Sequence, residues 1–109
     1  MAGLDANSTA DMTVDVVEDD DGTVTVRMSG ELDITNVERL AAAVAPALRH
    51  GPARLIVDAQ ALRFADSSAI ALWVRWAKVV PATELRNAPP TLRKVLESMG
   101  LAEMLNMAP

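Results

Sequence analysis

The 109-residue chain has no cysteine, no tyrosine, one phenylalanine, two tryptophans and a single histidine. The absence of cysteine excludes disulfides, thiol catalysis and cysteine-based zinc sites, and it fits a reducing compartment. The five glycines are never clustered, so the chain has no glycine-rich phosphate loop. No apolar run approaches the roughly 20 residues of a membrane span. The N-terminus has no basic segment before an apolar stretch, so we expect no secretory signal and a cytoplasmic protein.

Acidic charge is concentrated at the start of the chain. The formal net charge is −5, and residues 1–21 hold seven of the fifteen acids and no base. The rest of the chain is nearly neutral and has no basic stripe with interleaved aromatics, which argues against nucleic-acid binding. Half of the residues are apolar, which is enough for one core. We expect a flexible polar tail over residues 1–10 and a single domain over residues 11–109.

Strand signals are clear in four places. Two runs, 12–16 and 24–28, alternate apolar and polar residues with a period of two. An Asp-Gly pair at Gly22 separates them and predicts a hairpin, because glycine adopts a positive φ without cost. Residues 53–59 are apolar on both faces, which is typical of a central parallel strand. A short fourth strand is predicted over residues 83–87.

The first predicted helix spans residues 37–48. Its apolar residues recur at three- and four-residue intervals on one face. Thr35 and Glu38 have the spacing of a capping box at its start. Pro46 should kink this helix or tighten its last turn. His50 follows at the helix C-terminus, where a cation meets the helix dipole favourably, and we expect no other partner for it.

Two further helices are predicted. The second begins at an N-cap formed by Asp66 or Ser67. Trp73 and Trp76 share its apolar spacing, and we assign both to the core because tryptophan usually buries a large area. Arg75 belongs to its exposed side. The third helix follows two prolines, which suit the first turn of a helix, and it ends at a glycine.

The predicted order is strand, strand, helix, strand, helix, strand, helix. It indicates an α/β fold with a mixed four-stranded β-sheet: an N-terminal antiparallel hairpin, then parallel strands linked by α-helices packed on the sheet. Loops at the carboxyl ends of parallel strands are the expected functional edge. Residues 32–36 and residues 65–68 fall on that edge.

Conventional catalysis has little support. His50 lies at the far end of its helix from the functional edge, so no Ser-His-acid set can form there. The acids of the edge are Asp33 and Asp66 alone, while Asp58 is expected to close a strand. Two carboxylates without a third ligand make a poor metal site. We therefore expect no enzymatic activity, no metal and no cofactor.

The sequence Asp66-Ser67-Ser68 at a helix start permits three interpretations. A plain N-cap is the most common. Free N–H groups at a helix start can also bind an anion. The third interpretation is phosphorylation of a serine hydroxyl, which adds about −1.5 to −2 charges where the helix dipole tolerates them. The residues by themselves leave all three open.

Three stretches carry a family resemblance. They are VRMSGELD (26–33), LIVDAQALRFADSS (55–68) and PTLRKVLESMGL (90–101). The first resembles the second strand and Gly-Glu-Leu-Asp end of the STAS domain in its stand-alone form, the anti-sigma-factor antagonist. The second resembles that family's central strand and Asp-Ser-Ser loop, and the third its last helix and closing Gly-Leu. The resemblance covers about residues 12–107.

The resemblance implies a switch without catalysis. Such a domain, when unphosphorylated, sequesters an anti-sigma factor of the GHKL serine kinase class, and phosphorylation of a loop serine releases it. A phosphatase removes the phosphate from the serine again. The phosphorylated serine maps onto Ser67, with Ser68 as second choice. We expect the partner to bind the exposed side of the second helix and the loops beside it. The expected partner-binding residues are Asp33, Thr35, Asn36, Asp66, Ser67, Ser68, Ala69 and Arg75.

Two alternatives use the same loop. Some small STAS proteins resemble this one and serve as scaffold subunits on the ATPase of an ABC-type lipid transport system, where the loop hydroxyls would act only as hydrogen-bonding groups. Nucleotide binding at the same edge is the other alternative.

The chain also departs from the family pattern. Ala69 stands where glycine is usual, and residues 78–84 form a shorter segment, which predicts a short or displaced last strand.

Overall fold

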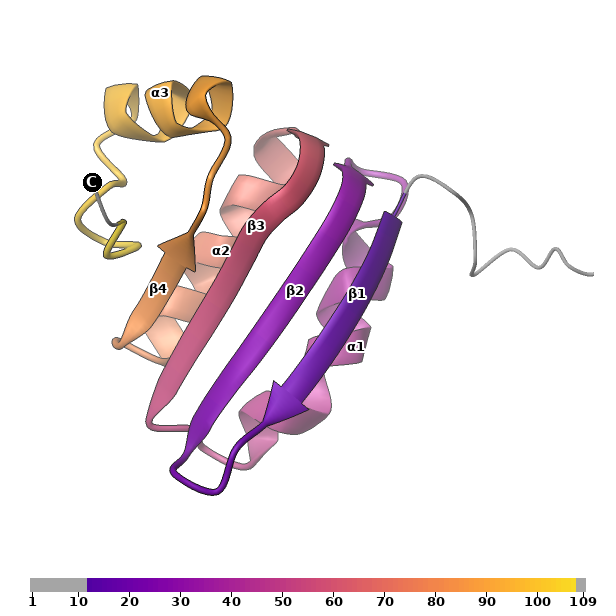
Figure 1. Cartoon of the computed structure of the whole chain (residues 1–109), viewed down its shortest axis with the longest axis vertical. Coiled ribbons are helices and arrows are strands. Elements are labelled where there is room, and N and C mark those ends of the chain that lie inside the picture. The colour runs from indigo at the N-terminus through magenta and orange to yellow at the C-terminus, as the bar shows by residue number, and fades with distance from the viewer. Residues whose placement is uncertain (1–11, 108–109) are drawn as a thin grey trace, which may run out of the picture.

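The structure, a computed structural model, describes residues 12–107. The tail predicted over residues 1–10 lies outside the described residues. The elements follow the predicted order (Figure 1). The strands are β1 (Met12–Glu18), β2 (Thr23–Leu32), β3 (Arg54–Ala65) and β4 (Thr83–Arg86), and the helices are α1 (Val37–Arg49), α2 (Ser67–Val79) and α3 (Pro90–Ser98).

The predicted mixed four-stranded sheet is confirmed. The strands lie in the order β1-β2-β3-β4. β1 and β2 pair antiparallel through a turn in which Gly22 has a φ of 86°, a conformation that suits glycine. β2 with β3, and β3 with β4, pair parallel. α1 and α2 cover one face of the sheet, the other face is open, and α3 lies beyond the end of β4 (Figure 1).

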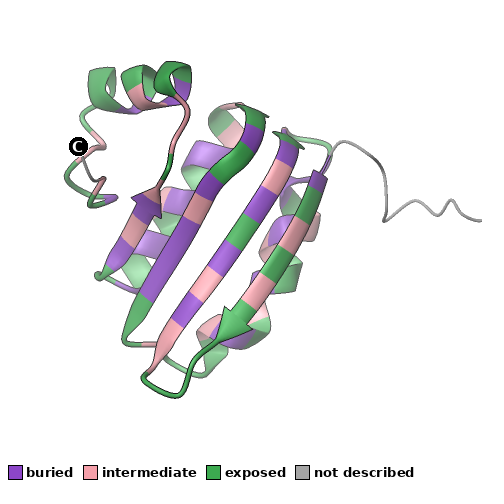
Figure 2. Ribbon diagram, viewed as in Figure 1, coloured by how far each residue is buried: buried purple, intermediate pink, exposed green. Residues whose placement is uncertain are grey.

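The core lies between the sheet and the helices α1 and α2. β2 alternates buried and more exposed residues along its whole length, as its period of two predicts (Figure 2). Trp73 and Trp76 are 0% and 4% exposed, which confirms their assignment to the core. Three consecutive residues of β3, Leu55, Ile56 and Val57, are buried. β3 is therefore the central strand that the doubly apolar run predicted.

β3 is longer than predicted. It does not end at residue 59 but continues to Ala65, because β2 runs on beside it and offers pairing partners through two register shifts. The expectation that Asp58 closes the strand is therefore wrong, since this half-buried residue lies inside β3. In this added part of the strand, Phe64 is 53% exposed.

The start of α1 differs from the predicted capping box. The N-cap is Asn36, and no side chain caps the helix. Thr35 instead donates to Asp33 through both its N–H and its hydroxyl. A threonine hydroxyl that bonds backward in a turn is no longer available to the helix. The capping box of Thr35 and Glu38 is therefore wrong.

The last turn of α1 is tightened, which is one of the two effects predicted for Pro46. The N–H of His50 donates to the carbonyl of Ala47, three residues back, at 3.2 Å, and His50 is the C-cap. The His50 side chain does have a partner, contrary to expectation. Its Nδ1 lies 2.8 Å from Oε1 of Glu18 at the end of β1.

β4 is short, as predicted, and the C-terminal segment covers its outer edge (Figure 1). The N–H of Leu85 donates to the carbonyl of Leu105 at 2.8 Å, and Nδ2 of Asn106 donates to the carbonyl of Thr83 at 2.7 Å. Leu105 is fully buried. These contacts satisfy backbone groups that an uncovered edge strand would present to other chains.

Candidate functional site at the carboxyl ends of the central strands

β2 and β3 bring the two expected loop segments together. Leu32 and Ala65, the last residues of these strands, are register partners. The N–H of Asp66 donates to the carbonyl of Leu32 at 3.0 Å. Because neighbouring parallel strands end side by side, the loop before α1 and the start of α2 form one continuous edge.

The loop between β2 and α1 is held by its own polar side chains. Oδ1 of Asp33 accepts from the N–H of Thr35 at 2.9 Å and from its hydroxyl at 2.5 Å. Oδ1 of Asn36 accepts from the N–H of Asp33 at 3.0 Å, and its Nδ2 donates to the carbonyl of Glu31 at 2.8 Å. Both ends of this buried amide are therefore satisfied. The loop presents Asp33 and Thr35 in a fixed arrangement.

α2 begins directly at this edge. Of the two N-caps predicted, the structure selects Asp66, whose Oδ1 accepts from the N–H of Ser68 at 2.9 Å and from its hydroxyl at 2.5 Å. Ser67 is the first residue of the helix and is exposed. Within residues 12–107, the Ser67 hydroxyl has no hydrogen-bond partner. One serine hydroxyl is thus occupied by the cap, and the other faces solvent.

The Asp66 carboxylate is held in its charged form. The Ser68 hydroxyl is the main cause, and the N–H groups of Ser68, Ala69 and Ile34 add to it, so that the pKa of Asp66 lies below its ordinary value of 3.8 despite the opposing effect of burial. The Ile34 N–H belongs to the loop before α1. One carboxylate therefore caps α2 and supplies a negative charge next to Ser67.

The structure leaves six of the eight expected partner-binding residues at least partly exposed: Asp33, Thr35, Asp66, Ser67, Ser68 and Arg75. Asn36 and Ala69 are 5% and 0% exposed. Both side chains therefore lie inside the domain and not at its surface, and that of Asn36 holds the loop before α1 through its hydrogen bonds. Arg75 is exposed on α2, about 12 Å from Ser67 at 1.5 Å of helix rise per residue.

Comparison with known proteins identifies the family. The family model described as "Mlab, STAS domain" matches residues 16–106. The chain belongs to the STAS domain family. An "Anti-sigma F factor antagonist" from Lysinibacillus sphaericus is 36% identical to it over 84 residues, which are 72% of this chain and 72% of the relative.

Solved STAS structures share the fold. An anti-sigma factor antagonist from Mycobacterium paratuberculosis has a TM-score of 0.80 at 24% identity, covering 90% of this chain and 86% of the other. The antagonist SpoIIAA in its unphosphorylated form has a TM-score of 0.74 at 30% identity, with 89% of each chain covered. The phosphorylated form of SpoIIAA from Bacillus has a TM-score of 0.69 at 30% identity, covering 89% of this chain and 92% of the other.

An apolar hollow that no sequence signal predicted lies beside this edge of the STAS domain. Its volume is about 210 Å³, and its lining includes Leu62, Phe64, Ala65 and Val95, so it lies between the end of β3 and α3. No periodic signal marks it, because the register shifts in β3 and the placement of α3 are both properties of the folded chain. Nearby Ile34 is 72% exposed, which adds an apolar side chain to the same edge.

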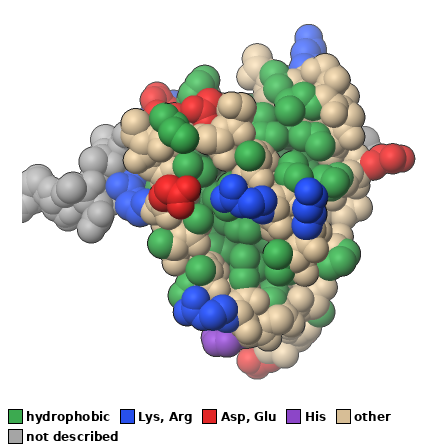
Figure 3. Space-filling view, turned by 180° about the vertical axis from the view of Figure 1, so that it is seen from behind, with side chains coloured by type: hydrophobic (Ala, Val, Ile, Leu, Met, Phe, Trp, Pro, Cys, Tyr) green, Lys and Arg blue, Asp and Glu red, His purple; other side chains and the backbone are tan. Residues whose placement is uncertain are grey.

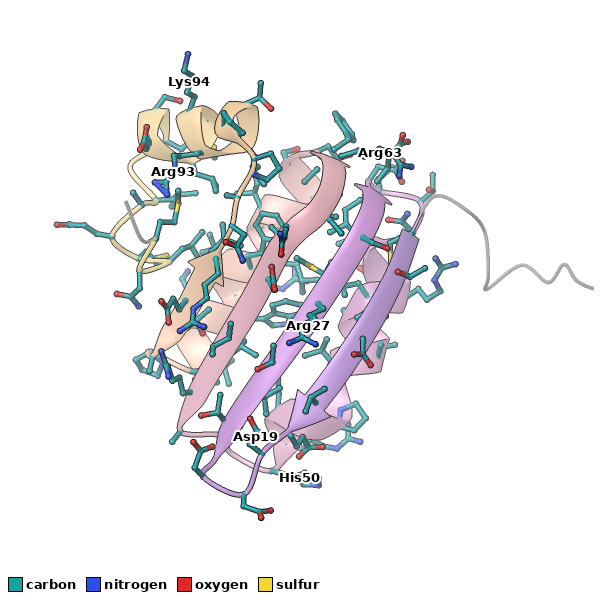
Figure 4. All side chains as sticks on the ribbon, viewed as in Figure 1. Asp19, Arg27, His50, Arg63, Arg93 and Lys94 are labelled. Carbon is teal, nitrogen blue, oxygen red and sulfur yellow. The ribbon has the colours of Figure 1, made fainter. Side chains whose placement is uncertain are left out.

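The opposite end of the domain carries a separate polar hollow, whose lining includes Glu18, Asp19, Asp20 and His50. Asp19 and His50 lie at that end, far from Arg63, which lies at the end of the domain that carries the candidate site (Figure 4). Over residues 12–107, no group of three histidine or acidic side chains could hold a metal ion. In the same range, no helix is long and apolar enough to cross a membrane.

Proposed function

We propose that this STAS domain is an anti-sigma-factor antagonist, a regulatory binding module whose contact with an anti-sigma factor is controlled by phosphorylation of Ser67. The observation that carries the proposal is the difference between the two loop serines. The Ser67 hydroxyl is exposed and has no partner within residues 12–107, whereas the Ser68 hydroxyl donates to Asp66. The antagonist from Lysinibacillus and the similarity to SpoIIAA, solved with and without phosphate, support it.

The expected modifying enzyme is the partner itself, an anti-sigma factor of the GHKL serine kinase class. In its reaction, Oγ of Ser67 forms a bond to the γ-phosphorus of ATP, the bond between that phosphorus and ADP breaks, and the hydroxyl proton passes to a base of the kinase. A phosphatase hydrolyses the phosphoserine and restores the hydroxyl.

Phosphorylation has opposite consequences for the fold and for the complex. The phosphate adds about −1.5 to −2 charges at the N-terminus of α2, where the helix dipole and free N–H groups favour an anion. A partner surface that fits a neutral hydroxyl must instead desolvate that charge, which is unfavourable. The neighbouring Asp66 carboxylate makes the local charge still more negative. The fold therefore persists while the complex dissociates.

The test uses purified wild-type chain with ATP and the GHKL-type anti-sigma factor encoded nearest to its gene. Intact mass and peptide mapping should show a single phosphate on Ser67. Ser67→Ala should remain unphosphorylated and bind the anti-sigma factor constitutively. Ser68→Ala is the matched control, and it should still accept phosphate at Ser67, although its stability falls with the lost cap contact.

Two results would contradict the proposal. One is a phosphate that maps to Ser68 and survives in Ser67→Ala. The other is an unphosphorylated chain that binds the ATPase of an ABC-type transporter, and not the anti-sigma factor, which would favour the scaffold function. Binding of ATP or GTP by the isolated chain, measured calorimetrically, would favour the nucleotide-binding alternative.

A further inference from the structure

The open face of the sheet is electrically balanced. Register neighbours across its four strands alternate in sign: Asp15, Arg27, Asp58 and Arg86. Arg27 lies 3.9 Å from Asp58, and Arg86 lies 3.1 Å from Glu84. Opposite charges on neighbouring strands stabilise a sheet. The cations of this face are therefore matched by acids of the chain itself.

The outer sides of α1 and α2 are not balanced in this way. The two helices contain four bases and a single acid, Glu38. Arg49, Arg75 and Lys78 are exposed, and none of the three has an ion pair within residues 12–107. These two helices therefore carry an excess of positive charge although the whole chain has a net charge of −5.

Small and apolar side chains lie between these cations. The helical face, as we call this surface, consists of the exposed residues Glu38, Ala42, Ala43, Pro46, Arg49, Ser67, Ala71, Arg75, Lys78 and Val79, so it carries three cations and one acid. Seen from behind, hydrophobic side chains run down the middle of the molecule with Lys and Arg side chains among them (Figure 3). Alanines at a helix surface let a second helix approach closely, because the interaxial distance depends on the side chains at the contact.

We infer that the helical face is the docking surface for an acidic amphipathic helix of the anti-sigma factor, an inference that rests on the proposed function. Charge complementarity identifies the occupant: unpaired cations around an apolar strip match a helix with an apolar stripe and acidic flanks. An uncharged apolar helix would leave these cations without partners, and a basic helix would be repelled by them.

The helical face also includes the switch residue. Ser67, Ala71, Arg75 and Lys78 follow one another at intervals of four, four and three residues, which places them along one side of α2. This line is about 16 Å long at 1.5 Å per residue. An acidic helix lying along it meets Arg75 and Lys78 at one end and Ser67 at the other. Phosphate on Ser67 then opposes the same acidic helix that the cations attract.

The experiment compares two exposed lysines that have no ion pair within residues 12–107. Lys78 belongs to the helical face, whereas Lys94 lies on α3 and projects away from the domain (Figure 4). Binding of Lys78→Glu and Lys94→Glu to the GHKL-type anti-sigma factor used above is measured by calorimetry at low and high salt. Lys78→Glu should weaken binding about tenfold and flatten its salt dependence, because rim charges act on association. Lys94→Glu should bind like wild type.

Each outcome decides the inference. Equal binding by Lys78→Glu, Lys94→Glu and wild type would overturn the inference while leaving the proposed function intact. Absence of wild-type binding would defeat the proposed function and the inference with it. A further measurement is sedimentation of the chain with phosphatidylglycerol vesicles. If wild type sediments with them and Lys78→Glu does not, while anti-sigma-factor binding is unchanged, the helical face is assigned to a membrane surface instead. If Lys78→Glu melts early, Lys78→Gln removes the cation without placing an acid at the helix C-terminus, and it must weaken binding in the same direction.

Discussion

Replacing Asp66 by alanine removes the carboxylate that caps α2 at the candidate site. The side chain accepts from the N–H of Ser68 at 2.9 Å and from its hydroxyl at 2.5 Å, and the Ile34 N–H contributes to its lowered pKa. Loss of an N-cap costs about 0.5–2 kcal/mol. Because Ser68 is only half-buried, water can take over its hydrogen bonds, so we expect about 1 kcal/mol, or about 4–8 °C in melting temperature.

The pH dependence of that loss identifies the carboxylate as its cause. The folded chain holds the pKa of Asp66 below its ordinary value of 3.8. A lowered folded-state pKa contributes stability that is fully present above the unfolded-state pKa and is lost as the pH falls through the folded-state pKa. The gap in melting temperature between wild type and Asp66→Ala should therefore be constant near neutral pH and should shrink below pH 3.8.

Differential scanning calorimetry at pH 7, 5 and 3 measures this gap. Asp66→Asn is the matched control, because asparagine is also a good N-cap but has no charge to lose. It should cost less than Asp66→Ala, and its pH profile should lack the carboxylate's contribution. A gap for Asp66→Ala that is zero at pH 7, or equal at pH 7 and pH 3, would refute the reasoning.

Three further substitutions test the packing. Val57→Asp places an unpaired charge at a position that is 1% exposed, so it should abolish cooperative melting. Its control is Val17→Asp, at a position of β1 that is 40% exposed, which should melt close to wild type. Leu105→Ala should cost about 2–5 kcal/mol in denaturant unfolding and should speed hydrogen exchange at the Leu85 amide, and unchanged exchange would contradict the edge cover. Trp73→Phe removes an indole N–H that has no hydrogen-bond partner within residues 12–107. The stability of this variant should stay within about 1 kcal/mol of wild type, because removal of an unsatisfied donor offsets the lost packing. A larger loss of stability would show that this donor is satisfied.

Local signals in the sequence determined much of the fold. The period of two in β2, the doubly apolar run of β3 and the tryptophan spacing of α2 each follow from side-chain direction within one element. The mixed sheet, and the edge at which the loops after β2 and β3 meet, follow from the order of those elements. The Asp-Ser-Ser segment predicted the helix start at Asp66, because N-cap preference depends on only a few neighbouring residues.

The tertiary structure decided what depends on residues distant in sequence. β3 continues to Ala65 because β2 lies beside it, and His50 has a partner because β1 ends next to α1. The capping box failed because Thr35 had a competing acceptor in Asp33. Burial of Asn36 and Ala69 follows from how the loops pack. The basic helical face belongs to no single element, because α1 and α2 are brought side by side only when both cross the same face of the sheet. Periodicity reports one element at a time, and the physical cause in each of these cases is a contact between two.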